Sequence, residues 1–350
     1  MDAFEDIINA AILAPSGENC QPWRFEIFSD EISIFNLPER DESLYNWGQK
    51  GSLIAHGALL ENIKIKASTF GLKPIIKLFP DAFQNHLVAK VKFEALSGKV
   101  ASPLEASLNT RCTNRKPYKE KALEPQSRAK LIDLSKPFNE VKLSFLEKKS
   151  DIKLMAQTAA LNERILFENS SMHNFFFNHI NWNKEEDRQK SIGFFIETLE
   201  MPFPAKFMFK LAKNWQNLQK LNQVGFSKMV AFANAKTYSS CSAIVALIKQ
   251  NDSNESWILS GQLLQRFWLA ATSLKINVQP ITGTLFLIRA GLHETEILSR
   301  KHIQLLFQAK KDIEKLFETE IENIAMILRV GYGKEPSAKS SRLQPQITYV

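Results

Sequence analysis

Two short segments carry side chains that could bind a flat ligand with a phosphate group. In the first, the loop of residues 15–23, Ser16 and Asn19 offer a hydroxyl and an amide that can donate and accept hydrogen bonds. This combination suits the edge of a heterocycle on which carbonyls alternate with ring nitrogens. An ordinary turn with local side-chain hydrogen bonds is the alternative interpretation of this spacing.

The second segment, residues 111–118, gathers positive charge around a hydroxyl group. Arg111 and Arg115 are four residues apart, so on a helix they would share one face, with Thr113 offset between them. Two guanidinium groups and a hydroxyl make a good phosphate clamp, because arginine matches phosphate oxygens bidentately. A solvated surface cluster paired with carboxylates is the alternative.

Positive charge is in excess over the whole chain. The 350 residues include 45 Lys and Arg against 37 Asp and Glu, which gives a formal net charge of +8. The basic residues are scattered, without the dense stripe typical of duplex binding, so we predict no nucleic-acid partner. A phosphate-bearing small molecule needs only two or three well-placed cations. Lys339 and Arg342, with Ser341 between them, could add to such a site, although alone this segment is typical of a disordered terminus.

Standard catalytic and metal-binding motifs are absent from the sequence. There is no GxxxxGK[ST], HExxH or GxSxG motif, and the six histidines do not fall at metal-ligand spacing. Cys20, Cys112 and Cys241 are widely separated, which predicts no disulfides and fits a reducing cytoplasm. Cys20 and Cys112 are interpreted as packing residues. The acidic start of the sequence and its short apolar stretches predict neither export nor a membrane span.

Hydrophobic periodicity predicts the elements that must position these segments. An opening helix ends before Pro15, and a long buried helix over 51–70 is followed by Gly71 at its C-terminus. The segment 97–103 is the best candidate for a boundary between two parts of the chain. Further helices are predicted over 151–167, 256–274 and 297–317, and strands over 25–27, 32–35, 75–79, 87–93, 243–249 and 325–330.

The two longest apolar helices resemble each other. Aligning Gly57 with Gly261 also pairs Leu60 with Leu264. Buried helices often look alike, which is the simpler explanation. A repeat would instead predict two copies of one fold, packed against each other as a pseudo-dimer within the chain.

Taken together, these segments resemble the FMN-dependent nitroreductase family. Residues 14–25, APSGENCQPWRF, look like the family's APSxxNxQPWxF motif, and residues 111–115 resemble its RRSxRxF-type phosphate-binding motif. Residues 261–283 resemble its second long helix and flavin-contacting loop, and residues 328–342 its last strand and phosphate-contacting tail. Here the arginine motif follows the first motif by about ninety residues, instead of preceding it. That order is similar to a duplicated, fused subgroup that includes the mycobacterial dormancy-associated (Acg-like) flavin-binding proteins.

The resemblance implies an α+β fold, with a central, mostly antiparallel sheet flanked by helices. It implies two fused half-copies that form an intramolecular pseudo-dimer: a shortened N-terminal half, residues 1–103, and a fuller C-terminal half, residues 104–350. We therefore expect a cytoplasmic monomer without a membrane partner. Segment 191–235, rich in Phe and Lys, has three interpretations: core plus a solvated helix face, a lid over the flavin, or a membrane-surface helix.

The resemblance also implies a cofactor, a reaction and a set of binding residues. The cofactor would be FMN, which would pass hydride from NAD(P)H to a nitroaromatic, quinone or similar acceptor, without a catalytic side chain or a metal. The alternative is a protein that binds or sequesters flavin with little turnover. Arg111, Arg115 and Arg342, helped by Lys339, would neutralise the phosphate, and the backbone of Thr282 and Gly283 would face flavin N5 and O4. The full implied set is Ser16, Asn19, Gln21, Arg111, Thr113, Arg115, Ile281, Thr282, Gly283, Lys339, Ser341 and Arg342.

Overall fold

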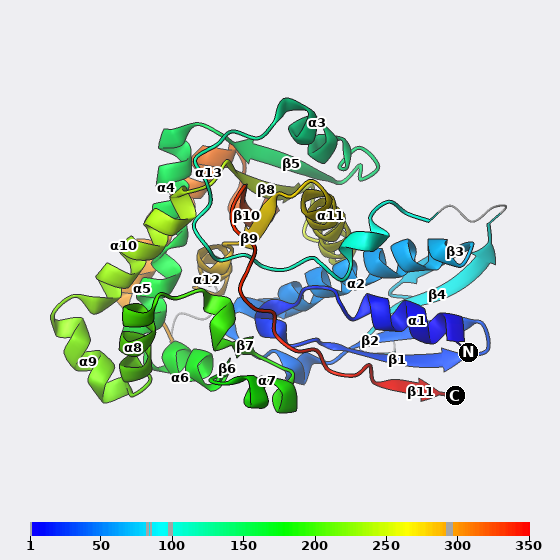
Figure 1. Cartoon of the computed structure of the whole chain (residues 1–350), viewed down its shortest axis with the longest axis horizontal. Helices are drawn as coiled ribbons and strands as arrows, with labels where there is room; N and C mark the ends of the chain where they lie inside the picture. Colours follow the sequence, from blue (N-terminus) through cyan, green and yellow to red (C-terminus); the bar gives the residue numbers. More distant parts are fainter. Residues whose placement is uncertain (1, 82–83, 85, 97–100, 292–296) are drawn as a thin grey trace.

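The computed structural model describes residues 2–81, 84, 86–96, 101–291 and 297–350 (Figure 1). The predicted boundary at 97–103 therefore lies largely outside the described residues. The chain is an α+β protein in which the predicted antiparallel pairing dominates, but its strands are divided between two main sheets. Two long helices cross between these sheets.

The first sheet is built from the N-terminal part of the chain and its last residues. Its strand order is β11-β1-β2-β4-β3, and all neighbours are antiparallel except β11, which pairs with β1 in parallel. The C-terminus therefore returns to the half in which the chain begins (Figure 1). The strands are β1 (Trp23–Phe28), β2 (Glu31–Asn36), β3 (Leu72–Leu78), β4 (Leu87–Ala95) and β11 (Ile347–Tyr349).

The second sheet separates two hydrophobic cores. It has the antiparallel order β5-β8-β10-β9, with β5 (Val141–Leu146), β8 (Ala243–Lys249), β9 (Asn277–Pro280) and β10 (Ile324–Gly331). Every residue of β8 and β10 is buried. Side chains alternate across a strand, so Val245 and Leu247 enter the core shared with the first sheet, whereas Ile244 and Ala246 enter a second, helical core.

The two central helices, α2 (Lys50–Thr69) and α11 (Asn254–Ser273), pack through a pair of glycines. A Cβ atom placed on Gly57 would lie 2.1 Å from the carbonyl oxygen of Ile258. A Cβ atom placed on Gly261 would lie 2.1 Å from the carbonyl oxygen of Ile54. Each glycine thus faces the carbonyl group of the residue that lies three positions before the other glycine. Such reciprocal contacts are expected at a local two-fold axis. The helices approach this closely because neither glycine carries a side chain.

The remaining helices surround the second core. The predicted helix over 151–167 is divided into two helices that meet at Ala160. No helix in the described part of the chain is long and apolar enough to cross a membrane. The elements are α1 (Asp2–Ala11), α3 (Pro125–Asp133), α4 (Lys149–Ala159), α5 (Leu161–Glu168), α6 (Ser170–Asn178), α7 (Lys184–Lys190), α8 (Phe203–Ala212), α9 (Trp215–Gln223), α10 (Phe226–Ser239), α12 (Gly283–Gly291) and α13 (Arg300–Phe317), with the short strands β6 (Ile180–Asn181) and β7 (Phe194–Phe195).

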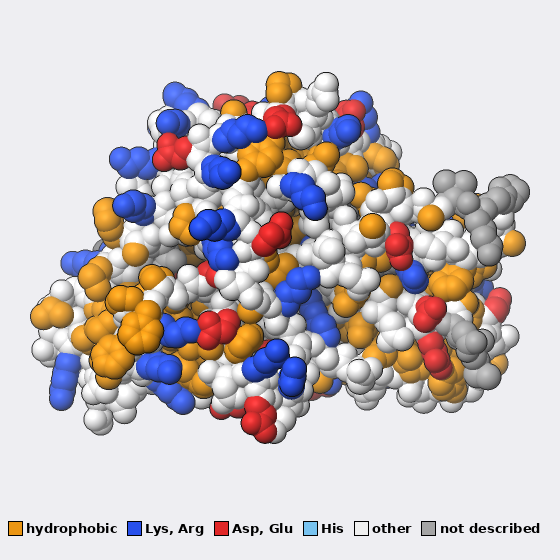
Figure 2. All heavy atoms as spheres, in the orientation of Figure 1, with side chains coloured by type: hydrophobic (Ala, Val, Ile, Leu, Met, Phe, Trp, Pro, Cys, Tyr) orange, Lys and Arg blue, Asp and Glu red, His pale blue; other side chains and the backbone are white. Residues whose placement is uncertain are grey.

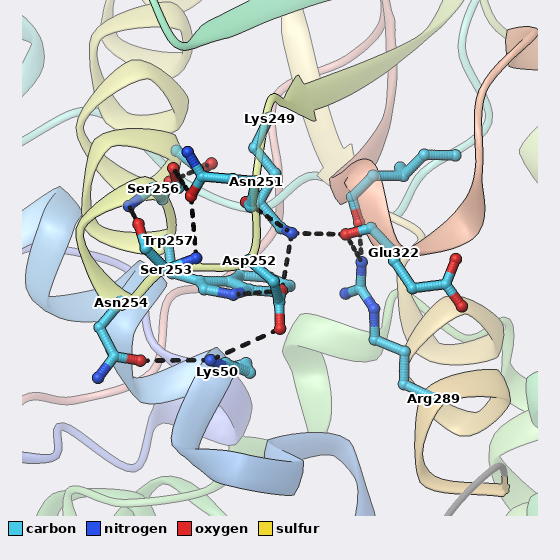
Figure 3. A network of polar contacts seen from close by, with 12 residues as sticks. Lys50, Lys249, Asn251, Asp252, Ser253, Asn254, Ser256, Trp257, Arg289 and Glu322 are labelled. Carbon is cyan, nitrogen blue, oxygen red and sulfur yellow. Dashed lines mark hydrogen bonds and ion pairs between the residues drawn. The ribbon is translucent and has the colours of Figure 1, made fainter.

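A polar network fixes the start of α11 to both parts of the chain (Figure 3). Lys249 Nζ, at the buried end of β8, donates to Asp252 Oδ1 at 2.7 Å and to the carbonyl of Glu322 at 2.5 Å. Trp257 Nε1 donates to the same Asp252 oxygen at 2.9 Å. Lys50 Nζ, at the start of α2, lies 3.9 Å from the other Asp252 oxygen. Burial lowers the pKa of Lys249, and the Asp252 carboxylate opposes that shift.

Candidate functional site

A cavity of about 490 Å³ is lined by residues from both sides of the predicted boundary. Its walls include the loop of residues 15–19, one face of α2, the segment 108–115, the start of α12 and the tail residues 339–342. The volume falls within the roughly 300–1,000 Å³ of small-molecule and cofactor sites. Its apolar lining includes Ile54, Leu264, Trp268, Phe286 and Met326. Nine of the twelve binding residues implied by the sequence line it, and the other three, Gln21, Ile281 and Ser341, are not among its lining residues.

The segment with the two arginines is extended, not helical, which corrects the helical geometry considered for it. Thr113 forms a parallel β-bridge with Val278, and Asn114 N donates to the Val278 carbonyl at 3.1 Å. Alternate residues of an extended chain face the same side, so Arg111, Thr113 and Arg115 all line the cavity. Buried Asn114 instead holds the tail, because its Nδ2 donates to the carbonyl of residue 334. A spacing of four residues therefore places both arginines on the same side of the chain in this geometry as well.

Arg111 is the most buried cation of the cavity. Its Nη2 donates to the carbonyl of Leu13 at 2.9 Å, and its guanidinium carbon lies 4.6 Å from the centre of the Trp268 ring. Its Nε is buried and has no hydrogen-bond partner among the described residues. Burial lowers the pKa of Arg111 to about 10. A buried donor without a partner is costly, so this side chain favours a ligand acceptor.

Arg115 and Arg342 are held by neutral oxygens. Arg115 Nη1 donates to the carbonyl of Thr198 at 3.1 Å, and Arg342 Nη1 donates to Asn19 Oδ1 at 2.6 Å. Burial lowers the pKa of both side chains, that of Arg342 to about 9, and the charge of Arg111 adds to this shift in Arg342. Like charges are therefore held close together in a desolvated place.

The cationic set of the cavity consists of Arg111, Arg115, Lys339 and Arg342. None of the four forms an ion pair with a carboxylate in the part of the chain that the structure describes. Exposed Lys339 donates from Nζ to the carbonyl of Asn109 at 2.7 Å. Because unpaired cations in a desolvated site are costly, the set favours a ligand with several anionic oxygens.

The loop of residues 15–23 holds an unusual backbone conformation beside the cavity. Glu18, Asn19 and Gln21 have φ values of 46°, 59° and 52°, in the left-handed region that non-glycine residues rarely adopt. Ser16 Oγ accepts a hydrogen bond from Gln21 N at 3.0 Å. Asn19 lines the cavity, but its Nδ2 donates to the carbonyl of Ser341 at 2.9 Å while its Oδ1 binds the tail arginine. The Asn19 side chain thus orients the tail, instead of facing the cavity with free donors and acceptors.

Three predicted residues do not line the cavity but hold its walls. Gln21 is buried and donates from Nε2 to the carbonyl of Ser191 at 2.7 Å. Ser341 donates from Oγ and from its backbone N to Asp187 Oδ2, at 2.7 and 2.9 Å. Ile281 packs into the helical core. In this structure these three side chains contact other groups of the protein and not the cavity.

The start of α12 brings backbone amides to the cavity. Thr282 and Gly283 line it, and α12 begins at Gly283, so the first amides of this helix have no partner within the helix. They present the positive end of the helix dipole. A Cβ atom on Gly283 would lie 2.5 Å from Cγ of Asn162, which explains the glycine at this close approach.

A second polar set in the lining was missed by sequence reasoning. Glu18, Asp41, Tyr45 and Asn162 all line the cavity, and the Tyr45 hydroxyl donates to Asn162 Oδ1 at 2.8 Å. Burial, followed by the charge of Asp41, raises the pKa of Glu18 well above 4.5. Glu18 Oε2 is buried without a hydrogen-bond partner among the described residues. Glu18 lies inside the recognised loop motif, whereas Tyr45 and Asn162 come from segments without a sequence pattern.

The cysteines and the segment 191–235 touch the cavity at few points. Cys112 lines it and Cys20 is buried nearby, and burial raises the pKa of both thiols. Within segment 191–235, the lining residues are Phe194 and Thr198. A lid role for the rest of the segment stays a prediction. Among the described residues, no His, Cys, Asp and Glu side chains gather in a group that could hold a metal ion.

Comparison with known protein sequences gives one distant relative. No protein-family model matches the chain. The uncharacterized protein MT1398 of Mycobacterium tuberculosis (strain CDC 1551 / Oshkosh) is 21% identical over 339 residues, which covers 97% of this chain and 47% of that protein. The chain thus spans about half the length of the curated relative it matches.

Comparison with solved structures returns flavoproteins at low similarity. A nitroreductase with bound FMN from Bacteroides fragilis is 8% identical, covering 69% of this chain and 95% of that one, with a TM-score of 0.36. The FMN-dependent nitroreductase NfnB from Mycobacterium smegmatis, in complex with NADPH, is 10% identical, covering 67% and 93%, with a TM-score of 0.35. An FMN-dependent nitroreductase from Clostridium difficile R20291 is 13% identical, covering 68% and 90%, with a TM-score of 0.33. Because these TM-scores are below 0.5, no conclusion about the chemistry of the cavity is based on these structures.

Proposed function

We propose that the protein is an FMN-binding, nitroreductase-like oxidoreductase. The observation that carries this proposal is the cationic set in the cavity, which has no carboxylate partner among the described residues and includes the unpartnered Nε of Arg111. A phosphate monoester supplies the charge and the several acceptor oxygens that such a set favours. The apolar lining beside it suits a flat ring system.

The residues that would hold the cofactor belong to three elements. Arg111 and Arg115, from the extended segment, and Arg342, from the tail, would bind the phosphate, with Lys339 at the exposed margin. Thr113 offers a hydroxyl between the two arginines. The start of α12 would lie against the ring system, where its amides favour negative charge.

The chemistry itself would come from the cofactor. When bound, FMN supplies hydride exchange with NAD(P)H and with an acceptor such as a nitroaromatic or a quinone. The chain's own part is to orient the ring, to exclude water with its apolar lining and to hold protons. Burial raises the pKa of Glu18, which favours its protonated form, and a protonated Glu18 would donate a hydrogen bond to a molecule in the cavity.

The absorption spectrum of the purified protein, before and after anaerobic addition of NADH or NADPH, tests the proposal. We expect a flavin spectrum that bleaches with one of the two nucleotides. Flavin that persists unbleached would support the alternative, a flavin-sequestering protein. A colourless protein that does not bind added FMN would contradict both.

Arginine variants test the assignment of the phosphate site. We expect Arg111→Ala and Arg115→Ala each to weaken FMN binding by roughly 10- to 100-fold, because each removes charge-assisted hydrogen bonds to the phosphate. Fluorescence titration of FMN measures this. Arg128→Ala is the matched control, because Arg128 lies on α3, away from the cavity lining, where it pairs with Glu147. Equal affinity in the two cavity variants and the control would place the phosphate elsewhere.

A further inference from the structure

A protruding apolar surface lies on helices α8 to α10, outside the cavity. On α8, Phe203 and Phe207 are four residues apart and are 83% and 57% exposed. Val224, between α9 and α10, is 84% exposed, and Phe232 on α10 is 74% exposed. Hydrophobic side chains gather over this end of the molecule, at the lower left of Figure 2. Soluble proteins rarely expose a large contiguous apolar patch without a binding function.

The opposite faces of the same helices are firmly packed. Phe209 of α8, Leu218 of α9 and Phe226 of α10 are buried in the helical core. The ring centres of Phe167 and Phe209 lie 6.5 Å apart, and those of Phe167 and Phe226 lie 5.8 Å apart. The exposed aromatics are therefore the outer face of an ordered unit. They are not core residues displaced by loose packing.

The charge on the helices of this surface is positive. Residues 201–240 contain six lysines and no Asp, Glu or Arg. Lys206 pairs with Glu197, and Lys213 lies over the Trp182 ring. The other four, at positions 210, 220, 228 and 236, form no ion pair in the described part of the chain. Lys or Arg side chains lie around the apolar area, and acidic side chains lie at its margin (Figure 2).

We propose that this surface, formed by α8, α9 and α10, docks onto an anionic lipid bilayer. Exposed aromatic residues enter the boundary between headgroups and acyl chains, and each nearby lysine adds attraction to anionic headgroups. A second copy of the chain fits less well, because a symmetric contact would bring two lysine-rich surfaces together. The proposal replaces the expectation of no membrane partner and is independent of the proposed flavin chemistry.

Co-sedimentation with vesicles tests the docking surface. The purified protein is expected to pellet with vesicles of equal parts phosphatidylcholine and phosphatidylglycerol, and at least ~10-fold less with phosphatidylcholine alone. Raising the salt concentration should reduce binding to the anionic vesicles, because it screens the lysines. Equal binding to both kinds of vesicle, or to neither, would overturn the proposal.

A matched pair of phenylalanines distinguishes this surface from general stickiness. Phe207 on α8 is 57% exposed and Phe307 on α13 is 59% exposed, but Phe307 lies outside the surface formed by α8, α9 and α10, and α13 carries Asp312 and Glu314 as well as lysines. We expect Phe207→Ser to reduce pelleting with anionic vesicles several-fold and Phe307→Ser to leave it unchanged.

Charge reversal provides a second test that does not touch the apolar side chains. Lys210→Glu combined with Lys228→Glu should weaken binding to the anionic vesicles without changing the thermal unfolding midpoint, because both side chains are exposed. Light scattering should show the wild-type chain at the mass of one copy. A dimer that both Phe207→Ser and the charge reversal dissociate would identify the surface as a self-association site and refute membrane docking.

Discussion

Glu163 is a buried carboxyl next to the cavity residue Asn162. Its Oε1 accepts a hydrogen bond from the Tyr238 hydroxyl at 2.7 Å, and its Oε2 has no hydrogen-bond partner among the described residues. Burial raises the pKa of Glu163 from 4.5 to about 7. The folded state therefore binds a proton between pH 4.5 and 7 that the unfolded state has already released, so rising pH in this window destabilises the fold.

Glu163→Gln should remove this pH dependence. Relative to the variant, the free energy of unfolding of the wild-type protein should fall by about 3 kcal/mol between pH 4.5 and 7 and change little above that. Urea unfolding of both proteins at pH 5 and pH 8 measures the difference. Glu147→Gln is the control, because Glu147 is an exposed carboxyl that pairs with Arg128. A wild-type minus variant difference that is the same at both pH values would show that Glu163 is ionised in the folded protein throughout.

At this scale the sequence predicts which residues gather, but not what each one contacts. Arg111 and Arg115 line the cavity because their spacing aligns them on an extended chain as well as on a helix. Ser341 is in the predicted set, but its hydroxyl donates to Asp187, and it is Ser340 that lines the cavity; only the tail's path decides between these two serines. Tyr45 and Asn162 could not be predicted, because their proximity depends on tertiary packing.

At the scale of elements, the crossing of α2 and α11 depends on two glycines. In an ordinary helix, Gly→Ala would stabilise the protein by about 1 kcal/mol. Here we expect Gly57→Ala and Gly261→Ala each to destabilise it by about 3 kcal/mol, because the new methyl group would meet a carbonyl oxygen at 2.1 Å. Thermal and urea unfolding measure the loss.

Gly291→Ala is the matched control for the helix crossing. Among the described residues, a Cβ atom at Gly291, the last residue of α12, would meet the flexible ends of Leu298 and Leu306, at 3.2 and 3.6 Å. We expect its effect on stability to be small. If the substitutions at Gly57 and Gly261 were equally mild, the two helices would be free to separate, and the close crossing would not hold the halves together.

Elements with a strong pattern of their own were predictable, and elements defined by their partners were not. The helices α2 and α11 and the strand β8 begin and end within two residues of the predicted bounds, because each is a stretch rich in apolar residues with a clear start and end. The strand β11 has three residues and exists only through its pairing with β1. In α8 and α10 the apolar residues are divided between a core and an exposed surface, which weakens the periodic signal.

At the scale of the whole molecule, the two halves share both a core and a cavity. We propose that they arose by duplication. The reciprocal contacts of Gly57 and Gly261, with each glycine against the backbone three residues before the other, support this proposal. Each half also contributes a mostly antiparallel sheet beside its long helix. The cavity is lined by residues from both halves, so neither half alone contains the whole binding site. This shared site would favour keeping the two halves in one chain.

The tail connects the halves a second time, which leads to a prediction about ligand binding. From the end of β10 it passes the cavity, where Arg342 contacts Asn19, and then pairs as β11 with β1. Deleting residues 344–350 would keep Lys339 and Arg342 but free the end that holds them in place. We expect FMN affinity to fall by about 10-fold. Without the β11 anchor, binding of FMN would have to order the tail, and the loss of conformational entropy would reduce the affinity.

Fluorescence titration of the truncated chain, beside full-length Arg342→Ala, separates anchoring from charge. Truncation should lower affinity with little change in its salt dependence, because the cations remain. Arg342→Ala should lower both, because it removes a charge from the phosphate site. If truncation leaves the affinity of the full-length chain unchanged, the contacts of residues 339–343 with the loop of residues 15–23 and with Asp187 suffice to hold the tail. The β11–β1 pairing would then stabilise the first sheet alone.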